Sequence, residues 1–292
     1  MNENSSELWK KIRVGVYLAF TILAFSSMEV LANPIRDRID PFALTFWRFL
    51  LGAAFLFPFA WPRLRHADAP ISRKDYFKLA FLGCLNVILS MGAHAVSVKY
   101  AKASTAAILI ASNPIATNLL AWVILGESLT KRRGISLLIG VFGVIMISLH
   151  RQTGVDTTLG VIAGIIGMVG FALYSVLSKD IVKRLGSMST ATVSFSFAVL
   201  IYLPLLWVSG VQIWPASDLW IRLLILGIIV SGLGYVTFFK ALAELPVGKA
   251  SLLFFFKPPV AIFLAWIILG ETPALGACFG TILIMAAILS EK

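Results

Sequence analysis

The strongest constraint on the fold is an internal repeat. Residues 121–127 (AWVILGE) recur at 265–271 (AWIILGE) with one change, at an offset of 144 residues, which is about half the chain. Each copy ends a long apolar run, and each run has a proline at the same place, Pro114 in the first and Pro258 in the second. Matching apolar runs of this kind predict two copies of one membrane unit, a common construction in transporters.

The composition indicates an integral membrane protein. Hydrophobic residues make up 59% of the chain and charged residues only 13%, whereas a soluble domain carries roughly a quarter charged residues. The net charge of +11 comes from basic residues in short loops between apolar blocks, so it does not predict nucleic-acid binding. Cys84 and Cys278 lie inside apolar blocks and form no disulfide framework or metal-ligand spacing, and no cofactor is expected.

The apolar residues form blocks long enough to cross a bilayer as helices. The blocks are continuously apolar and lack the alternation of membrane strands. The predicted fold class is therefore an all-α integral membrane protein with ten transmembrane helices. The spans are expected at 13–33, 42–61, 76–97, 103–125, 132–149, 158–178, 188–208, 218–240, 248–269 and 273–290.

Loop charges predict the orientation of these spans. Most Lys and Arg residues fall in loops on the side of the N-terminus, as in Lys10–Arg13 and Lys131–Arg133, while few fall on the other side. Basic loops stay in the cytoplasm. We therefore expect a multi-pass protein of the cytoplasmic (inner) membrane with both termini in the cytoplasm.

The number of spans in each half determines how the two copies of the repeat are oriented in the membrane. The offset places the fourth span over the ninth, so 1–150 and 151–292 each hold five spans. Because five is odd, the second half enters the membrane from the opposite side. The sequence thus predicts two inverted five-helix repeats, which can interconvert inward-open and outward-open states around a midplane site.

This arrangement and its motif resemble the drug/metabolite transporter superfamily, in particular its EamA-type members. The motif is a mid-helix proline followed by Ala-Trp-x-x-Leu-Gly-Glu, present from Asn113-Pro114 to Glu127 and from Lys257-Pro258 to Glu271. The resemblance implies alternating access without ATP hydrolysis. It also implies a central cavity lined by spans 1, 3, 4, 6, 8 and 9, with span 2 at the periphery. The chain departs from many relatives at Lys257, where they carry a neutral or acidic residue.

Lys257 is the leading candidate for contact with a solute. A charge inside a span costs at least about 2.5 kcal/mol, so it needs a reason. Lys257 lies about 13 Å into its span, close to the midplane. Pro258 and Pro259 follow it and loosen the helical hydrogen bonding there. A cation at such a site suits an anionic group; the alternative is a structural ion pair with a carboxylate.

Glu29 and Arg48 form a second pair of intramembrane charges. They lie about 6 and 9 Å below the same membrane edge, on consecutive spans, so they can meet. The alternatives are a structural ion pair, contact of Glu29 with solute, or a role in proton coupling. His94, near the end of the third span, is a further candidate for proton coupling, or else a satisfied structural histidine.

Weaker candidates lie on the spans expected to line the cavity. Asn113 is the repeat counterpart of Lys257, and Asn86 lies near mid-membrane. Tyr174 and Tyr235 either line the cavity or serve as ordinary membrane aromatics. Phe256 belongs to a run of three phenylalanines, of which some are expected to face the cavity and some the lipid.

The sequence predicts a secondary transporter that exports small metabolites, amino acids or related organic solutes. An uptake carrier for organic anions or carboxylates on the same fold is the alternative, supported by Lys257 and Arg48. No phosphate-binding loop or catalytic triad is present, so an enzyme is not expected. The expected partners are a small-molecule substrate and the lipid bilayer, with proton coupling as an option and a monomer favoured.

Overall fold

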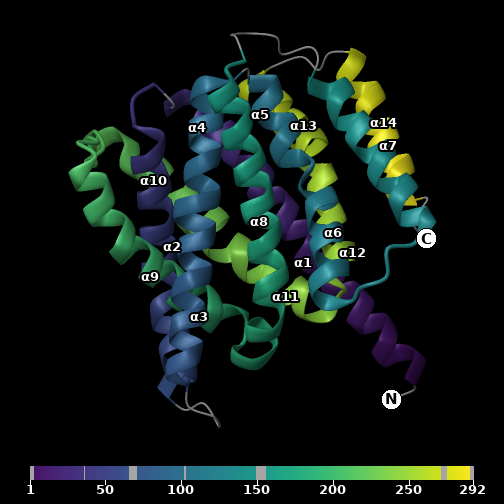
Figure 1. Ribbon diagram of the computed structural model, residues 1–292, viewed down its shortest axis with the longest axis horizontal. Coiled ribbons are helices and arrows are strands. Elements are labelled where there is room, and N and C mark those ends of the chain that lie inside the picture. The colour runs from purple at the N-terminus through teal and green to yellow at the C-terminus, as the bar shows by residue number, and fades with distance from the viewer. Residues whose placement is uncertain are drawn as a thin grey trace.

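The computed structural model describes residues 3–35, 37–65, 71–101, 103–148, 156–270 and 275–289. Within them every regular element is helical (Figure 1). The first half contains α1 (Glu3–Ala32), α2 (Pro41–Arg65), α3 (Arg73–Gly83), η2 (Cys84–Met91), α4 (Gly92–Tyr100), α5 (Ala103–Ala111), α6 (Asn113–Leu125) and α7 (Lys131–Ser148). The second half contains α8 (Thr158–Leu185), α9 (Ser187–Val208), α10 (Trp220–Ile225), η4 (Leu226–Leu233), α11 (Gly234–Glu244), α12 (Val247–Ser251), η5 (Leu252–Phe256), α13 (Lys257–Leu269) and α14 (Leu275–Leu289).

All ten predicted segments are helical where they are described. Eight helical stretches in the described residues are long and apolar enough to cross a membrane. The other two segments are α7, which begins with three basic residues, and α14, whose described part is 15 residues long. These two helices pack against each other at one side of the bundle (Figure 1). Ten crossings therefore remain a prediction, while an all-helical membrane fold is confirmed.

Matching positions of the two halves have the same local structure. The helices α6 and α13 both have a proline in the first turn, which the free N–H groups of a helix start tolerate. Both end at a glycine with positive φ, Gly126 at 67° and Gly270 at 73°, a conformation that costs glycine little. Corresponding π-helical segments, η2 and η4, interrupt the third and eighth predicted spans.

Two ends of the bundle are defined by contacts between helix termini. At the lower end in Figure 1, Arg13 near the start of α1 pairs with Glu244 at the end of α11 at 2.8 Å. Asp75 in the first turn of α3 pairs there with Arg184 in the last turn of α8. At the upper end, the Thr157 hydroxyl before α8 donates to the carbonyl of Tyr100 at the end of α4, at 2.6 Å.

The surface of the bundle is rich in large apolar side chains. Exposed examples occur on helices all around the molecule, among them Phe77, Trp122, Leu138, Trp207 and Ile267. A soluble monomer rarely exposes contiguous apolar surface of this extent, whereas lipid-facing helices do. The surface therefore agrees with a protein that crosses the bilayer several times.

Candidate functional site

A cavity of about 250 Å³ lies between the two halves of the chain. The first half contributes side chains of α1, α2, η2, α4, α5 and α6, and the second half those of α8, η4, α11, η5 and α13. Its lining reaches the upper end of the bundle at Ala32, Pro41 and Val98. The cavity is slightly smaller than the about 300–1,000 Å³ of sites for drug-sized ligands, so it suits a small metabolite.

Five of the residues predicted from the sequence line this cavity. They are Arg48, His94, Asn113, Tyr235 and Lys257. Among the described side chains of the lining, Arg48 and Lys257 are the only ones with a fixed charge, and both are positive. The side chain of Glu29 lies outside the described residues. A cationic wall of this kind suits a solute with a carboxylate or another anionic group.

Helix α2 has a larger part in the cavity than the resemblance implied. Leu44, Thr45 and Arg48 on α2 all line it. The expectation of a peripheral second span is therefore wrong for the upper half of this helix. The cause is close packing lower down, where an added Cβ on Gly52 would lie 2.9 Å from the carbonyl oxygen of Gly227. A glycine at this crossing lets α2 approach the helices of the cavity.

The floor of the cavity is aromatic. Phe25, Phe171, Tyr235 and Phe254 all line it and contact one another. The rings of Phe25 and Tyr235 are 5.1 Å apart, and Phe171 meets Phe254 edge-on at 5.3 Å with an interplanar angle of 89°. Such pairs favour fixed ring positions. The cavity thus offers a charged wall and a rigid apolar floor to an amphipathic solute.

Three predicted contact residues do not line the cavity. Phe256 directly precedes the lining residue Lys257 in the sequence, but in the 3-10 turn of η5 Phe254 lines the cavity instead. Tyr174 is fully buried below the floor and packs against Phe239, with ring centroids 5.8 Å apart. Asn86 is fully buried behind Tyr235. Helical periodicity could not separate Phe256 and Asn86, because the 3-10 turn of η5 and the π-helical segment η2 shift the register of their helix faces.

Asn86 acts on the cavity through Tyr235. The Tyr235 hydroxyl donates to Asn86 Oδ1 at 3.4 Å, a long hydrogen bond. Asn113 is also held in place, because its Nδ2 donates to the Met168 carbonyl on α8 at 3.0 Å and its Oδ1 accepts from Thr117 at 3.0 Å. These contacts fix the orientation of the Tyr235 and Asn113 side chains at the cavity wall.

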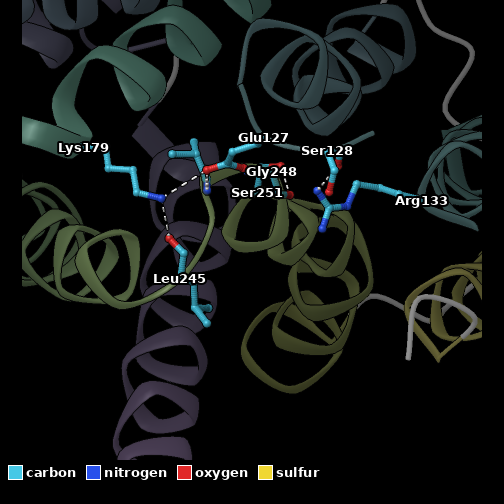
Figure 2. Close-up of polar contacts among 8 residues, drawn as sticks. Glu127, Ser128, Arg133, Lys179, Leu245, Gly248 and Ser251 are labelled. Carbon is cyan, nitrogen blue, oxygen red and sulfur yellow. Dashed lines mark hydrogen bonds and ion pairs between the residues drawn. The ribbon is translucent and has the colours of Figure 1, made fainter. Parts of the chain in front are cut away.

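The lower end of the bundle carries a second polar cluster, around Glu127 (Figure 2). Oε1 of Glu127 accepts from the backbone N–H of Val247 at 2.7 Å, and Oε2 accepts from that of Gly248 at 3.0 Å. Lys179 on α8 donates to Oε1 at 3.1 Å and to the carbonyl of Leu245 at 3.0 Å. The carboxylate that ends the first copy of the repeat thus ties α6 to α12 and α8 of the second half, and Lys179 extends the cluster to the turn after α11.

The sequence pattern of the EamA-like transporter family matches this chain twice, over residues 13–149 and 158–290. The chain belongs to the EamA-like transporter family. It is a transporter and not an enzyme, and the two matched stretches correspond to the two halves that form the cavity.

Relatives of this EamA transporter carry transporter names. It is 29% identical to an uncharacterized transporter of Clostridium kluyveri, covering 92% of this chain and 90% of the relative. It is 28% identical to a probable terminal-alkyne amino-acid exporter of Streptantibioticus cattleyicolor, over 64% of this chain and 63% of that one. It is 22% identical to an S-adenosylmethionine uptake transporter of Rickettsia prowazekii, over 94% and 92% of the two chains.

Among solved proteins, a crystal structure with a similar course of the chain shares the fold of this EamA transporter. The superposition covers 96% of each chain with a TM-score of 0.82 at 18% sequence identity. At this identity the likeness establishes the fold and nothing about the transported solute. The helical arrangement described above is thus one that a known protein also adopts.

The Glu127 cluster predicts a pH dependence of stability in this EamA transporter. Burial alone would raise the pKa of Glu127, but the N–H groups of Gly248 and Val247 and the ammonium of Lys179 together hold it below the ordinary value of 4.5. A carboxyl with a lowered folded pKa stabilises the protein above its unfolded pKa, and that stability is lost as the pH falls through the folded pKa. We expect Glu127→Gln to melt below the wild type above pH 4.5, and the two melting temperatures to converge as the pH falls through the lowered pKa of Glu127. Melting curves of both proteins across this range test it, and a gap that stays constant contradicts it.

Proposed function

We propose that this EamA transporter moves amino acids or related small organic solutes out of the cell by alternating access. The observation that carries the proposal is the cavity of about 250 Å³, which both halves form and which combines Lys257 and Arg48 with an aromatic floor. A carboxylate group of the solute would contact Lys257, and an apolar side chain would pack against Phe25 and Phe254. The relative named as an amino-acid exporter supports the same class of solute.

In this proposal the two halves, 1–150 and 151–292, are inverted repeats, an arrangement that supports alternating access. The opposite directions of two matched helices support this proposal. The Glu127 contacts place the end of α6 beside the start of α12 at the lower end, so α6 runs toward this end while α12, η5 and α13 run away from it. Inverted halves can exchange conformations and thereby open the cavity to either side.

We expect the lower end and both termini to lie in the cytoplasm, an orientation that the basic loops support. If protons drive transport, His94 in the cavity wall and Glu29 on α1 are the proposed carriers. A monomer suffices for this mechanism, because one chain supplies the whole described lining of the cavity.

The second candidate function is uptake of organic anions or carboxylates. The two cationic side chains of the cavity wall favour it, and the relative named as an S-adenosylmethionine uptake transporter shows that uptake occurs among similar chains. S-adenosylmethionine combines a nucleoside with an amino acid, so a cavity of this volume suits smaller solutes.

A thermal-shift screen of the purified protein against a metabolite panel tests the proposed function. We expect stabilisation by small amino acids with apolar side chains, because bound solute stabilises the folded state by mass action. Stabilisation by dicarboxylates alone would favour the uptake carrier, and stabilisation by neither class would overturn both. Counterflow of the stabilising solute in proteoliposomes then measures transport, and its dependence on an imposed pH gradient tests proton coupling.

A further inference from the structure

The cavity and the Glu127 cluster occupy opposite ends of the bundle. On α8, the cavity lining stops at Phe171, and Lys179 lies eight residues further on, about 12 Å away at 1.5 Å per residue. On the ninth predicted span, the lining begins at Phe254, and Val247 lies about 10 Å below it by the same measure. The cavity is therefore open toward the upper end and separated from the lower end by a layer of protein.

This layer is densely packed. Tyr174, Phe238, Phe239 and Leu242 lie within it, each with at most 1% of its surface exposed. A solute in the cavity cannot reach the lower end unless these side chains and the helices that carry them separate. The contacts at the lower end of the layer decide how readily that happens.

The Glu127 carboxylate joins these helices at the lower edge of the layer. It links the end of α6, the N-terminus of α12 and Lys179 of α8, while Lys179 also binds the turn after α11 through the carbonyl of Leu245 (Figure 2). Only 14% of either the Glu127 or the Lys179 side chain is exposed. Charge-assisted hydrogen bonds of this kind are stronger than neutral ones.

Two buried polar atoms lie on the elements that this contact joins. Within the described part of the chain, Ser178 Oγ and Asn118 Oδ1 are buried without a hydrogen-bond partner. Ser178 directly precedes Lys179, and Asn118 contacts the Gly248 carbonyl through its Nδ2 at 3.2 Å. Unpartnered buried oxygen atoms cost free energy, particularly in a membrane protein. Both oxygen atoms would gain hydrogen bonds to water if the lower end opened. Opening would therefore recover part of the free energy that their burial costs.

We propose that the contacts of the Glu127 carboxylate hold a gate at the lower end closed. While it accepts from Lys179 and from the N–H groups of Val247 and Gly248, the cavity opens only toward the upper end. Release of this carboxylate lets α8, α11 and α12 separate from α6 and opens the cavity to the lower end. The inference rests on the proposed alternating access, and it gives the glutamate of the repeated motif a conformational role.

Cysteine accessibility tests the gate. In a background with Cys84→Ala and Cys278→Ala, Ser178→Cys reports on the lower end and Val98→Cys on the upper rim of the cavity. A maleimide reagent is applied to the purified protein. We expect Glu127→Gln to raise labelling of the lower reporter about tenfold, equivalent to about 1.4 kcal/mol, and to lower labelling of the upper one. The amide keeps one acceptor but loses the charge and brings N–H groups toward those of α12.

Two further variants sharpen the test. Glu244→Gln is the matched control, because Glu244 is a carboxylate at the same end that pairs with Lys10 and Arg13 on α1. We expect it to leave both reporters unchanged. Exchange of the partners, Glu127→Lys with Lys179→Glu, restores opposite charges but places an ammonium against the N–H groups of α12. We expect this double variant to label like Glu127→Gln.

Lys179→Met is a milder variant that tests the gate even if the other variants fail to fold, since it keeps the carboxylate and its bonds to α12. We expect an intermediate rise of the lower reporter. Unchanged labelling in folded Glu127→Gln, or a rise at both reporters together, would overturn the gate. Because the readout needs no solute, these outcomes are independent of the solute screen: a failed screen would count against the proposed function and leave the gate standing.

Discussion

Replacement of Lys257 by alanine is expected to weaken solute binding by at least about 30-fold, equivalent to about 2 kcal/mol. Lys257 lies in the cavity wall at the start of α13, and the Ser26 hydroxyl donates to its carbonyl at 3.1 Å, which fixes the backbone beside α1. Alanine keeps this backbone contact and removes the ammonium together with the methylene chain that carries it. Lys257→Arg keeps the charge and should retain most of the binding. Titration calorimetry with the solute identified by the thermal screen measures the loss.

A stability measurement separates the two roles considered for Lys257. If it contacts the solute, Lys257→Ala should bind weakly while its melting temperature without solute stays near that of the wild type. A large drop in the melting temperature with normal binding would instead identify a structural ion pair. Lys240→Ala is the matched control, because this lysine lies over the ring of Tyr17 at 5.0 Å, at the lower end of the bundle. It should leave solute binding unchanged.

The coarse architecture was predictable because it depends on long apolar runs and on the prolines and glycines that interrupt or end them. The ninth span was predicted at 248–269, and the structure has helix from Val247 to Leu269, interrupted where Pro258 and Pro259 remove N–H donors. Gly126 and Gly270 end their helices through positive φ, which a sequence signals directly. Arg48 and Lys257 were found because charges in apolar runs are rare.

The cavity and the gate depend on contacts that no local pattern encodes. Phe254 replaces Phe256 in the lining because a 3-10 turn rotates the face by an amount that an ideal helix does not predict. Glu127 follows a helix end, where a carboxylate is unremarkable, and its partners lie 52 to 121 residues away. The recurrence of this glutamate at position 271 was the one sequence signal for such a role. A repeated glutamate is equally typical of a position with a purely structural role.

Substitution of Gly83 by alanine is expected to destabilise the protein by about 3 kcal/mol or more and to lower its melting temperature by roughly 10 °C. Gly83 ends α3, directly before the π-helical segment η2, and faces α9. An added Cβ would lie 2.0 Å from the carbonyl oxygen of Ser194 and 2.8 Å from its carbonyl carbon. Backbone atoms cannot turn away as a side chain can, so α3 and α9 must separate. Thermal unfolding of the purified variant measures the effect.

Gly15→Ala provides the control, because Gly15 lies in α1 and nothing lies within 4 Å of an added Cβ. Alanine is the better helix former by about 1 kcal/mol, so this variant should melt at or slightly above the wild-type temperature. A melting temperature of Gly83→Ala equal to that of the wild type would contradict the close approach of α3 and α9. That approach positions η2 and α4 beside the cavity, so folded Gly83→Ala should also bind solute more weakly, while Gly15→Ala should bind it normally.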